Sequence, residues 1–555
     1  MLGRALVIAL AVAAVAVAFV TSRDSGGEKP SPPAAAQPGP NAVSVSFYYS
    51  PEKAKLLEPL IERFNASGAR SGGKRVFVDG RNIASGEAEA GIATGKLKPV
   101  LWSPASSFWG RLLNYEADQP LVADDNPSIV STPLVIAMWE ELADAYGYPR
   151  RDLGYEQLAE LAVGGWAAVG RPQFGPFKYV HTNPDFSTSG LSAVAASYYA
   201  AADKLEGLTV EDIARTRGQV KRLERSIVHY GDTTLFIAQE MRRHGLGYAS
   251  AAAMEETTLI DFNRKAGDGP KLVAVYPSEG TFFSDNPLIT LQGDWVTRAH
   301  EQAGAAFADY LAREITPEVA GQQGFRPADE NTAPAGLVST ANGVDPEQPE
   351  RVLRLPEPRV LARIKAAWRE DRKPANVMVV LDNSASMGDE NKLEKAKEGL
   401  KAFLAEAAPH DRIGLTKFSN EVEELVEIAP MSENRKKLLA AVEGIFPEED
   451  TRVRDAIVDG VHAVERKRDK GAINAVVALT DGADTASDRS VEEVAEELAA
   501  QGERETGQIR VFTIAYGKQP NDVELARYAQ ESGGKPFVAG TQDIEIVYRE
   551  ISSFF

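Results

Sequence analysis

The sequence predicts an α/β protein built from more than one folding unit, and three observations support this prediction. The chain has 555 residues, which is more than a single hydrophobic core usually organises. Short apolar strands alternate with amphipathic helices from Val43 onward, a pattern typical of parallel sheets covered by helices. A second such pattern begins at Val377, where a buried-strand run ends abruptly in Asp382-Asn-Ser384-Ala-Ser386.

Composition limits the function classes. Apolar residues make up 43% and charged residues 25% of the chain, as in ordinary globular proteins. The formal net charge of −19, with no compensating stripe of Lys and Arg, argues against a nucleic-acid partner. The sequence contains no cysteine, which excludes disulfide bonds, thiolate catalysis, Cys-ligated zinc and a lipid-modified N-terminal cysteine.

The N-terminus has the features of an export segment. Residues 1–23 hold Arg4 and then an apolar run, which predicts a signal peptide or an N-terminal membrane anchor. An uncleaved anchor is favoured, because the large residues Phe19 and Val20 directly follow the small residues of the candidate cleavage site. Arg4 then predicts a single pass through the cell membrane with the bulk of the chain extracytoplasmic, whereas cleavage would give a secreted protein. Residues 24–40, rich in Pro, Gly and Ser, predict a disordered spacer.

Residues 41–335 carry the first alternating pattern. Strands are predicted at 43–49, 75–78, 99–102, 131–139, 273–276 and 288–291, with helices at 84–93 and 192–202 among others. Over residues 42–325 the order of these segments resembles the extracellular solute-binding proteins of bacteria, the family that includes molybdate- and sulfate-type receptors. The resemblance implies a type II periplasmic-binding-protein-like domain, in which two α/β lobes joined by crossing strands close over a cleft.

Hydroxyl side chains follow several of these strands where the next helix begins. Free backbone N–H groups and the positive end of the helix dipole make such junctions favourable for anions. We therefore expect a cleft for a small anion or another polar solute, lined by Ser50, Ser103, Ser106, Ser107, Ser187, Thr188, Ser189 and Tyr276. For each serine alone the alternative is a helix N-cap, which is the commonest role of Ser at that position.

Residues 336–375 predict a linker, because the stretch up to Glu350 is rich in Pro, Gly, Asn, Thr and Glu. Apolar residues at helical spacing over 360–368 predict a bridging helix within it. From Asn376 strands and helices alternate again, and the polar alternation over 422–428 predicts an antiparallel edge strand.

The strand run that ends at Asp382 carries the chemistry of this second unit. In open α/β sheets, ligands bind at the carboxyl ends of the strands, where the strand order reverses. Asp382, Ser384 and Ser386 would place three oxygen-bearing side chains there, and oxygen ligands suit Mg²⁺, with Mn²⁺ or Ca²⁺ as further candidates.

These residues resemble the metal-ion-dependent adhesion site (MIDAS) of von Willebrand factor A (VWA) domains, which adds a Thr from a later loop and an Asp after a later strand. Thr451 and Asp481 stand in those positions. The resemblance implies a doubly wound, Rossmann-like VWA domain over 376–555, whose metal is held by Asp382, Ser384, Ser386, Thr451 and Asp481. One coordination position would stay open for a carboxylate of a protein partner. One departure from the family is that Glu448, Glu449 and Asp450, instead of glycines, precede Thr451.

No catalytic constellation accompanies these motifs. Ser50-Pro-Glu-Lys53 and Ser284-Asp-Asn286 match two elements of penicillin-recognising enzymes, but the third, Lys-Thr-Gly, is missing. The expectation is therefore a non-enzyme: a membrane-tethered extracytoplasmic binding or adhesion protein that grips a protein partner through a Mg²⁺-dependent VWA site. The alternatives are a receptor that delivers a small anion or polar ligand to an ABC-type transporter, and a structural protein with an empty cleft.

Overall fold

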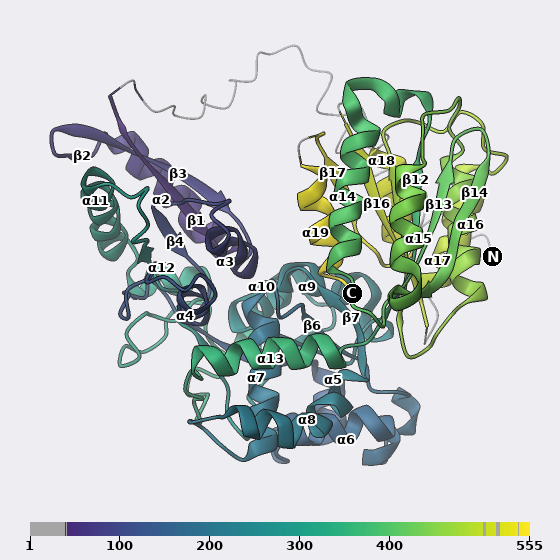
Figure 1. The fold of residues 1–555 in the computed structure, drawn as a ribbon. Helices are drawn as coiled ribbons and strands as arrows, with labels where there is room; N and C mark the ends of the chain where they lie inside the picture. The colour runs from purple at the N-terminus through teal and green to yellow at the C-terminus, as the bar shows by residue number, and fades with distance from the viewer. Residues whose placement is uncertain (1–38, 40, 503–506, 518–521, 542) are drawn as a thin grey trace, which may run out of the picture.

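The computed structural model describes residues 39, 41–502, 507–517, 522–541 and 543–555. The chain forms two lobes, lobe 1 around strand β1 and lobe 2 around strand β5, and a C-terminal domain around strand β12. In Figure 1, lobe 1 and the C-terminal domain lie above lobe 2, and the long helix α13 runs across lobe 2 beneath them. The predicted anchor at 1–23 and nearly all of the predicted spacer lie outside the described residues. Within the described part of the chain, none of the helices combines the length and the apolar character needed to span a membrane.

Lobe 1 is a five-stranded sheet in the order β11-β4-β1-β3-β2. Strands β1, β3 and β4 are parallel, as predicted, while the short edge strands β2 and β11 are antiparallel to their neighbours. The strands are β1 (Val43–Tyr49), β2 (Arg70–Ser71), β3 (Lys74–Asn82), β4 (Leu101–Ser103) and β11 (Ile289–Thr290). The helices are α2 (Ala54–Ser67), α3 (Ser85–Ala93), α4 (Ser107–Glu116), α11 (Arg298–Glu314) and α12 (Pro317–Gln322).

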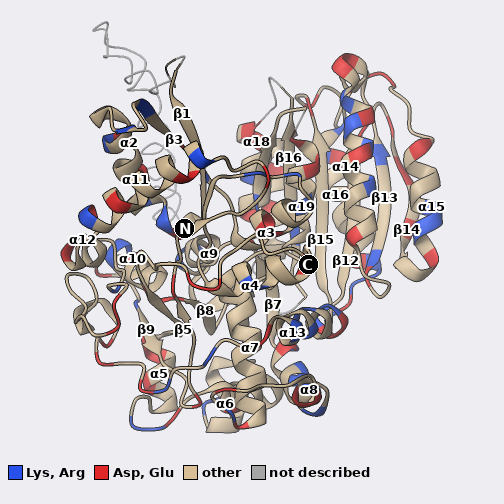
Figure 2. Cartoon of the chain, turned by 60° about the vertical axis from the view of Figure 1, so that its left-hand side comes forward, with Lys and Arg blue, Asp and Glu red and all other residues tan. Residues whose placement is uncertain are grey.

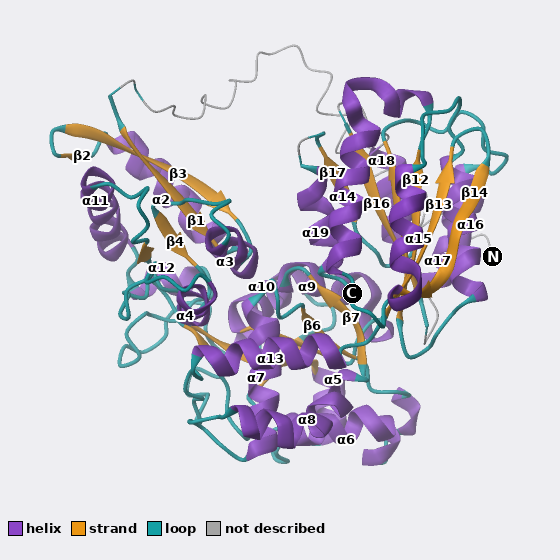
Figure 3. Ribbon diagram, viewed as in Figure 1, coloured by secondary structure: helices purple, strands orange, loops and turns teal. Residues whose placement is uncertain are grey.

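Lobe 2 is a six-stranded mixed sheet with the main order β10-β5-β8-β6-β7, to which β9 adds beside β5. Helices lie on both of its faces (Figure 3). Its strands are β5 (Thr132–Trp139), β6 (Tyr179–Thr182), β7 (Ile227–Gly231), β8 (Ala251–Glu255), β9 (Leu272–Val275) and β10 (Phe283–Ser284). Its helices are α5 (Glu140–Tyr146), α6 (Tyr155–Gly164), α7 (Thr188–Ala202), α8 (Val210–Glu224), α9 (Thr234–His244) and α10 (Glu256–Ala266).

The chain crosses between the lobes next to Ser131 and Asn286. Ser131 and Arg326 exchange two backbone hydrogen bonds of 3.0 and 2.8 Å, and Ser128 forms a bridge with Pro287. The buried Arg326 guanidinium forms two hydrogen bonds with the Glu256 carboxylate, at 2.6 and 2.8 Å. It also donates to the backbone oxygens of residues 345 and 346 in the predicted linker, called the connector below. A single side chain thus links the crossing segment, α10 and the connector.

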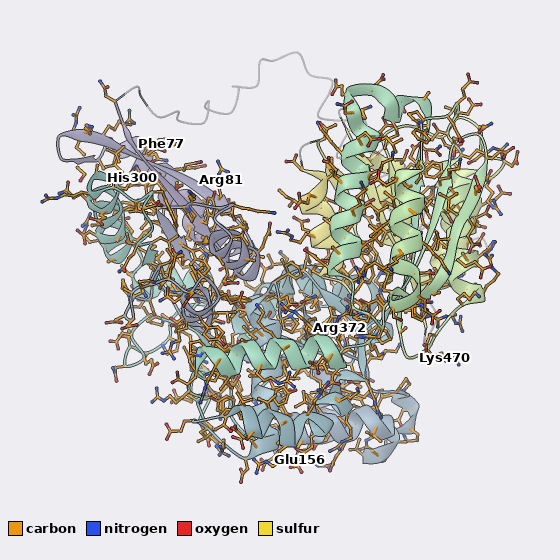
Figure 4. All side chains as sticks on the ribbon, in the orientation of Figure 1. Phe77, Arg81, Glu156, His300, Arg372 and Lys470 are labelled. Atoms are coloured by element: carbon orange, nitrogen blue, oxygen red, sulfur yellow. The ribbon has the colours of Figure 1, made fainter. Side chains whose placement is uncertain are left out.

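Helix α13 (Pro358–Asp371) confirms the predicted bridging helix. It packs against α4 of lobe 1 and against α7 and α8 of lobe 2. The buried Trp368 ring meets the Tyr230 ring edge-on, with centroids 5.1 Å apart. Arg369 forms two hydrogen bonds with Asp185 of lobe 2, and Arg372, at the end of the helix, forms two with Asp411 of the C-terminal domain (Figure 4). Because both lobes contact α13, an opening of the lobes has to shift this helix.

The C-terminal domain is a six-stranded sheet in the order β14-β13-β12-β15-β16-β17. All neighbouring pairs are parallel except β13 with β14, which confirms the predicted antiparallel edge. The strands are β12 (Ala375–Asp382), β13 (Arg412–Phe418), β14 (Val422–Pro430), β15 (Ile473–Thr480), β16 (Ile509–Tyr516) and β17 (Pro536–Ala539). The helices are α14 (Lys392–Glu406), α15 (Met431–Glu443), α16 (Val453–Arg466), α17 (Val491–Gly502), α18 (Asp522–Glu531) and α19 (Ile544–Ser552).

Both faces of this sheet are buried. Val377, Val379 and Leu381 of β12 pack in the apolar cluster that contains α14, α15 and α19, while Met378 and Val380 pack with α16, α17 and α18. The continuous apolar run of β12 is explained by this arrangement, since each side chain of a central strand has a helix layer to face.

The C-terminal domain and lobe 2 share a core. The Phe554 ring lies 5.2 Å from the Phe236 ring of lobe 2 and 4.9 Å from the Phe512 ring of β16, measured between centroids. Lys and Arg side chains are interspersed with Asp and Glu over both lobes and the C-terminal domain (Figure 2).

Candidate functional site

The carboxyl ends of β12 and β15 form the switch point of the C-terminal sheet. From β12 the chain builds outward to β13 on one side, and β15 takes the other side. Asp382 is the last residue of β12, and Asp481 directly follows β15, so the sheet brings together two carboxylates that lie 99 positions apart in sequence. This is where an open α/β sheet binds its ligands.

Asp382 is fully buried and held by two hydrogen bonds. Its Oδ1 accepts from the backbone N–H of Ser384 at 2.7 Å, and its Oδ2 accepts from the Thr480 hydroxyl at 2.6 Å. Burial raises the pKa of the Asp382 carboxyl to about 6, against the opposing effect of these hydrogen bonds. A buried carboxylate without an ion-pair partner among the described residues is electrostatically suited to a cation.

Ser384, Ser386 and Asp481 form a chain of polar contacts beside Asp382. The hydroxyls of Ser384 and Ser386 are 3.2 Å apart, and Ser386 donates to Oδ1 of Asp481 at 2.7 Å. The other Asp481 oxygen, Oδ2, lies 2.5 Å from Nζ of Lys392, at the start of α14. Four of the five predicted ligand residues are therefore adjacent, and a lysine that sequence analysis overlooked reaches the Asp481 carboxylate.

Thr451 lies on a loop that runs beside the Asp-x-Ser-x-Ser loop. Ser384 and Glu448 form a parallel bridge, in which the Glu448 N–H donates to the Asn383 oxygen at 2.7 Å. The loop is held by the Thr451 backbone N–H, which donates to the Thr485 hydroxyl at 3.0 Å. Glu448 pairs with Lys417 at 2.7 Å, so its charge is neutralised locally. Glu449 and Asp450 are exposed.

The donor set fits a hard divalent cation. All five predicted ligand residues offer oxygen atoms, and the two carboxylates bring the negative charge that such a cation needs. Across the described part of the chain, no group of three or more His, Cys, Asp and Glu side chains is arranged to hold a metal. The site therefore depends on hydroxyl ligands, as a set of two carboxylates and three hydroxyls implies.

The second candidate site is the cleft between the lobes. It is a small cavity of about 20 Å³, room for about one water molecule. Of the predicted cleft residues, Ser50, Ser187 and Thr188 line it. Its further lining residues are Pro51, Glu52, Ala84, Ser85, Ala105, Phe186, Asp232, Thr233, Thr234, Leu235 and Glu255.

The other predicted cleft residues do not line this cavity, and the side chains of four of them form hydrogen bonds elsewhere. Ser106 caps α4, because its hydroxyl accepts from the Phe108 N–H at 3.3 Å, and Ser107 bonds Asp285. Ser189 bonds Thr182 at 2.8 Å. Ser103 is buried at the end of β4. The Tyr276 hydroxyl donates to Glu256 and so belongs to the Arg326 cluster.

The sequence did not reveal which charged side chains line this cleft. Its lining includes three carboxylates, Glu52, Asp232 and Glu255, and no Lys or Arg among the described residues. The nearby Lys53 is fully buried behind the lining, where it bonds Asn286 at 2.8 Å. Two of these carboxylates are paired with lysines that lie outside the lining, Glu52 with Lys53 at 3.7 Å and Asp232 with Lys535, so the lining offers carboxylates and hydroxyls to a polar solute without three uncompensated negative charges.

Glu255→Gln is expected to alter how stability depends on pH. Burial, followed by the neighbouring Glu52, raises the pKa of Glu255 from 4.5 to about 7. Between these pH values the folded state keeps a proton that the unfolded state has lost, so the group lowers the unfolding free energy as pH rises. Urea unfolding should show Glu255→Gln to be more stable than the wild type at pH 8, by up to about 3 kcal/mol, and nearly equal to it at pH 4.5. The exposed Glu62→Gln serves as the control, and an identical pH profile in wild type and Glu255→Gln would contradict the assignment.

Comparison with known proteins agrees with this architecture. The sequence profile of the bacterial extracellular solute-binding protein family matches residues 45–326, just over half of the chain. The chain belongs to this family. The profile of the von Willebrand factor type A domain matches residues 376–547, so the C-terminal domain is a VWA domain. The α/β fold, with a two-lobed solute-binding domain followed by a VWA domain, is thereby confirmed.

Individual relatives match one domain at a time. Inter-alpha-trypsin inhibitor heavy chain H4 of Bos taurus is 26% identical over 168 residues, which are 29% of this chain and 18% of that protein. The chain thus spans about a fifth of the length of the curated relatives it matches. Among solved structures, the periplasmic binding protein AfuA from Actinobacillus pleuropneumoniae is 14% identical with a TM-score of 0.42, covering 59% of this chain and 98% of that one. The von Willebrand factor type A protein from Catenulispora acidiphila is 16% identical with a TM-score of 0.29, covering 33% of this chain and 43% of that one.

Proposed function

We propose that this chain is a membrane-tethered, extracytoplasmic binding protein that grips a protein partner through a divalent cation on its VWA domain. The observation that carries the proposal is the oxygen-donor set at the switch point, where Asp382 and Asp481 converge with the hydroxyls of Ser384 and Ser386. Mg²⁺ would be held by these residues together with Thr451, and it would supply a positive charge for a carboxylate of the partner. The solute-binding domain would present this face from outside the membrane, with residues 1–23 as the anchor.

The residues of this chain would orient the site before a partner arrives. The Ser384 N–H and the Thr480 hydroxyl fix both oxygens of Asp382, while Ser386 fixes one oxygen of Asp481. A site held in this way loses little conformational freedom on binding, which favours affinity.

An ion pair joins the lining of the solute cleft to the VWA domain. Asp232 lines the cleft and forms an ion pair with Lys535, just before β17 of the VWA domain. The Lys535 ammonium also lies over the Phe537 ring, 4.9 Å from its centroid. A separate cavity of about 600 Å³ is lined by residues of α3, the loop after β6, α13 and the VWA domain. A solute that changes how far the lobes close would alter the contact between Asp232 and Lys535. Coupling of the two sites requires such a contact to differ between the open and the closed state.

Metal-dependent capture tests the proposal. The full-length chain is immobilised and exposed to cell-envelope proteins in Mg²⁺ or in EDTA, with Asp481→Asn as the variant. We expect a partner that is retained in Mg²⁺ and lost both in EDTA and with Asp481→Asn. Retention that is indifferent to chelator would exclude a metal-dependent grip.

A second candidate function is a receptor that delivers a polar solute to a transporter. It is favoured by the family of residues 45–326 and by the hydroxyl-lined cleft. A transporter subunit captured equally well in Mg²⁺ and in EDTA would support this second function over the first.

A further inference from the structure

Lys392 lies in the candidate metal site, although nothing in the metal motif calls for a lysine. It is the first residue of α14, and the two residues before it, Glu390 and Asn391, have positive φ angles of 52° and 58°. These left-handed residues turn the chain sharply, so that α14 begins over the ends of β12 and β15. The backbone oxygen of Lys392 accepts a hydrogen bond of 3.2 Å from the Tyr516 hydroxyl, which fixes this end of the helix.

The Lys392 ammonium contacts one of the two carboxylates that a metal would use. Its Nζ lies 2.5 Å from Oδ2 of Asp481 and 3.3 Å from the backbone oxygen of Ser386. The Asp481 side chain is fully buried and that of Lys392 is 15% exposed, so the contact is shielded from water. Within the described residues, this is the ion pair that Asp481 makes.

The position of the lysine is costly unless its charge is used. A cation in the first turn of a helix faces the positive end of the helix dipole, where acidic residues are favoured instead. Asp481 offsets that cost, and Lys392 in turn compensates one of the two clustered carboxylates. Gly517, with a φ of 91°, lies beside the stem of Lys392, whose Cε would be in ordinary van der Waals contact with a Cβ at residue 517.

We propose that Lys392 is a tethered cation that competes with the divalent metal for Asp481 and thereby sets the metal affinity of the VWA site. Metal binding to Asp481 requires the ammonium to swing away toward solvent, and the displaced charge then stays close to the metal. Two like charges a few ångströms apart in a poorly hydrated site repel strongly. The lysine therefore weakens metal binding, and it compensates the Asp481 carboxylate before the metal arrives. This inference rests on the proposed metal site.

Isothermal titration calorimetry of the full-length chain with Mg²⁺ and Mn²⁺ tests the competition. Lys392→Met removes the charge, Lys392→Gln removes it but keeps a hydrogen-bond donor, and Lys392→Arg keeps it. We expect both neutral variants to bind metal at least about 10-fold more tightly than the wild type, and Lys392→Arg to stay close to it. Lys395→Met, one turn further along α14, is the matched control and should bind like the wild type.

A melting experiment supplies an independent measurement. In EDTA, Lys392→Met should melt at a lower temperature than the wild type, because the buried Asp481 carboxylate loses its compensating charge. Added Mg²⁺ should raise the melting temperature of Lys392→Met by more than that of the wild type, since a ligand that binds only the folded state stabilises it according to its affinity. If Lys392→Met fails to fold, the melting temperatures of Lys392→Gln in EDTA and in Mg²⁺ are compared with those of the wild type instead.

The outcomes separate this inference from the proposed function. Binding by the wild type with equal or weaker binding by both neutral variants overturns the competition and leaves the metal site standing. Binding by the neutral variants alone supports it in the strongest form, in which the lysine excludes the metal. Failure of every variant to bind either metal overturns both proposals.

Discussion

Asp382→Asn is expected to abolish divalent-cation binding by the VWA domain while the protein still folds. The substitution removes one of two carboxylates in a site whose remaining proposed ligands are Asp481 and neutral hydroxyls, and a hard divalent cation depends on that negative charge. We expect at least about a 100-fold loss of Mg²⁺ affinity, on the order of 3 kcal/mol. Isothermal titration calorimetry of the full-length chain measures it directly.

The fold should tolerate this change. Asn keeps an oxygen for the Ser384 N–H, and its amide can donate to the Thr480 hydroxyl in place of accepting from it. It also removes a buried charge, so the melting temperature in EDTA should equal or exceed that of the wild type. Asp459→Asn, on the exposed side of α16, is the control. Undiminished Mg²⁺ affinity in Asp382→Asn would rule out the proposed site.

Arg326→Ala is expected to destabilise the solute-binding domain by about 3–5 kcal/mol. The Arg326 side chain is 9% exposed and that of Glu256 is fully buried, so the truncation leaves an uncompensated carboxylate in the interior. It also removes the hydrogen bonds of 3.1 Å to the backbone oxygens of Asp345 and Pro346, which hold the connector against lobe 2. Urea unfolding followed by circular dichroism measures the loss.

Two further variants make this prediction specific. Arg63→Ala breaks an exposed pair with Glu314 and should cost less than about 1 kcal/mol. Replacing both buried partners, as Arg326→Met with Glu256→Leu, should recover much of the lost stability, because the cost comes from leaving one charge unpaired. If Arg326→Ala lowers the free energy of unfolding no more than Arg63→Ala does, the buried pair does not stabilise the segment that crosses between the lobes.

The sequence on its own determined the elements whose signals are local. The unbroken apolar runs that became β12 and β15 could be interpreted directly, because a strand covered on both faces needs an apolar residue at every position. The metal motif was equally local at Asp382, Ser384 and Ser386, three alternate positions after one strand. The bridging helix α13 followed from apolar residues at helical spacing, since that periodicity is set by the helix itself.

Only the tertiary structure decided the electrostatics of the two sites, because charge proximity depends on residues that are distant in sequence. Glu52, Asp232 and Glu255 come from both lobes, and folding gathers them around one cavity where hydroxyls alone had predicted an anion. Tyr276 does not line the predicted cleft because its hydroxyl donates to Glu256, which Arg326 also bonds. In the same way, the contact of Lys392 with Asp481 could not be predicted, because the two residues are 89 positions apart and only the fold places the first turn of α14 beside Asp481.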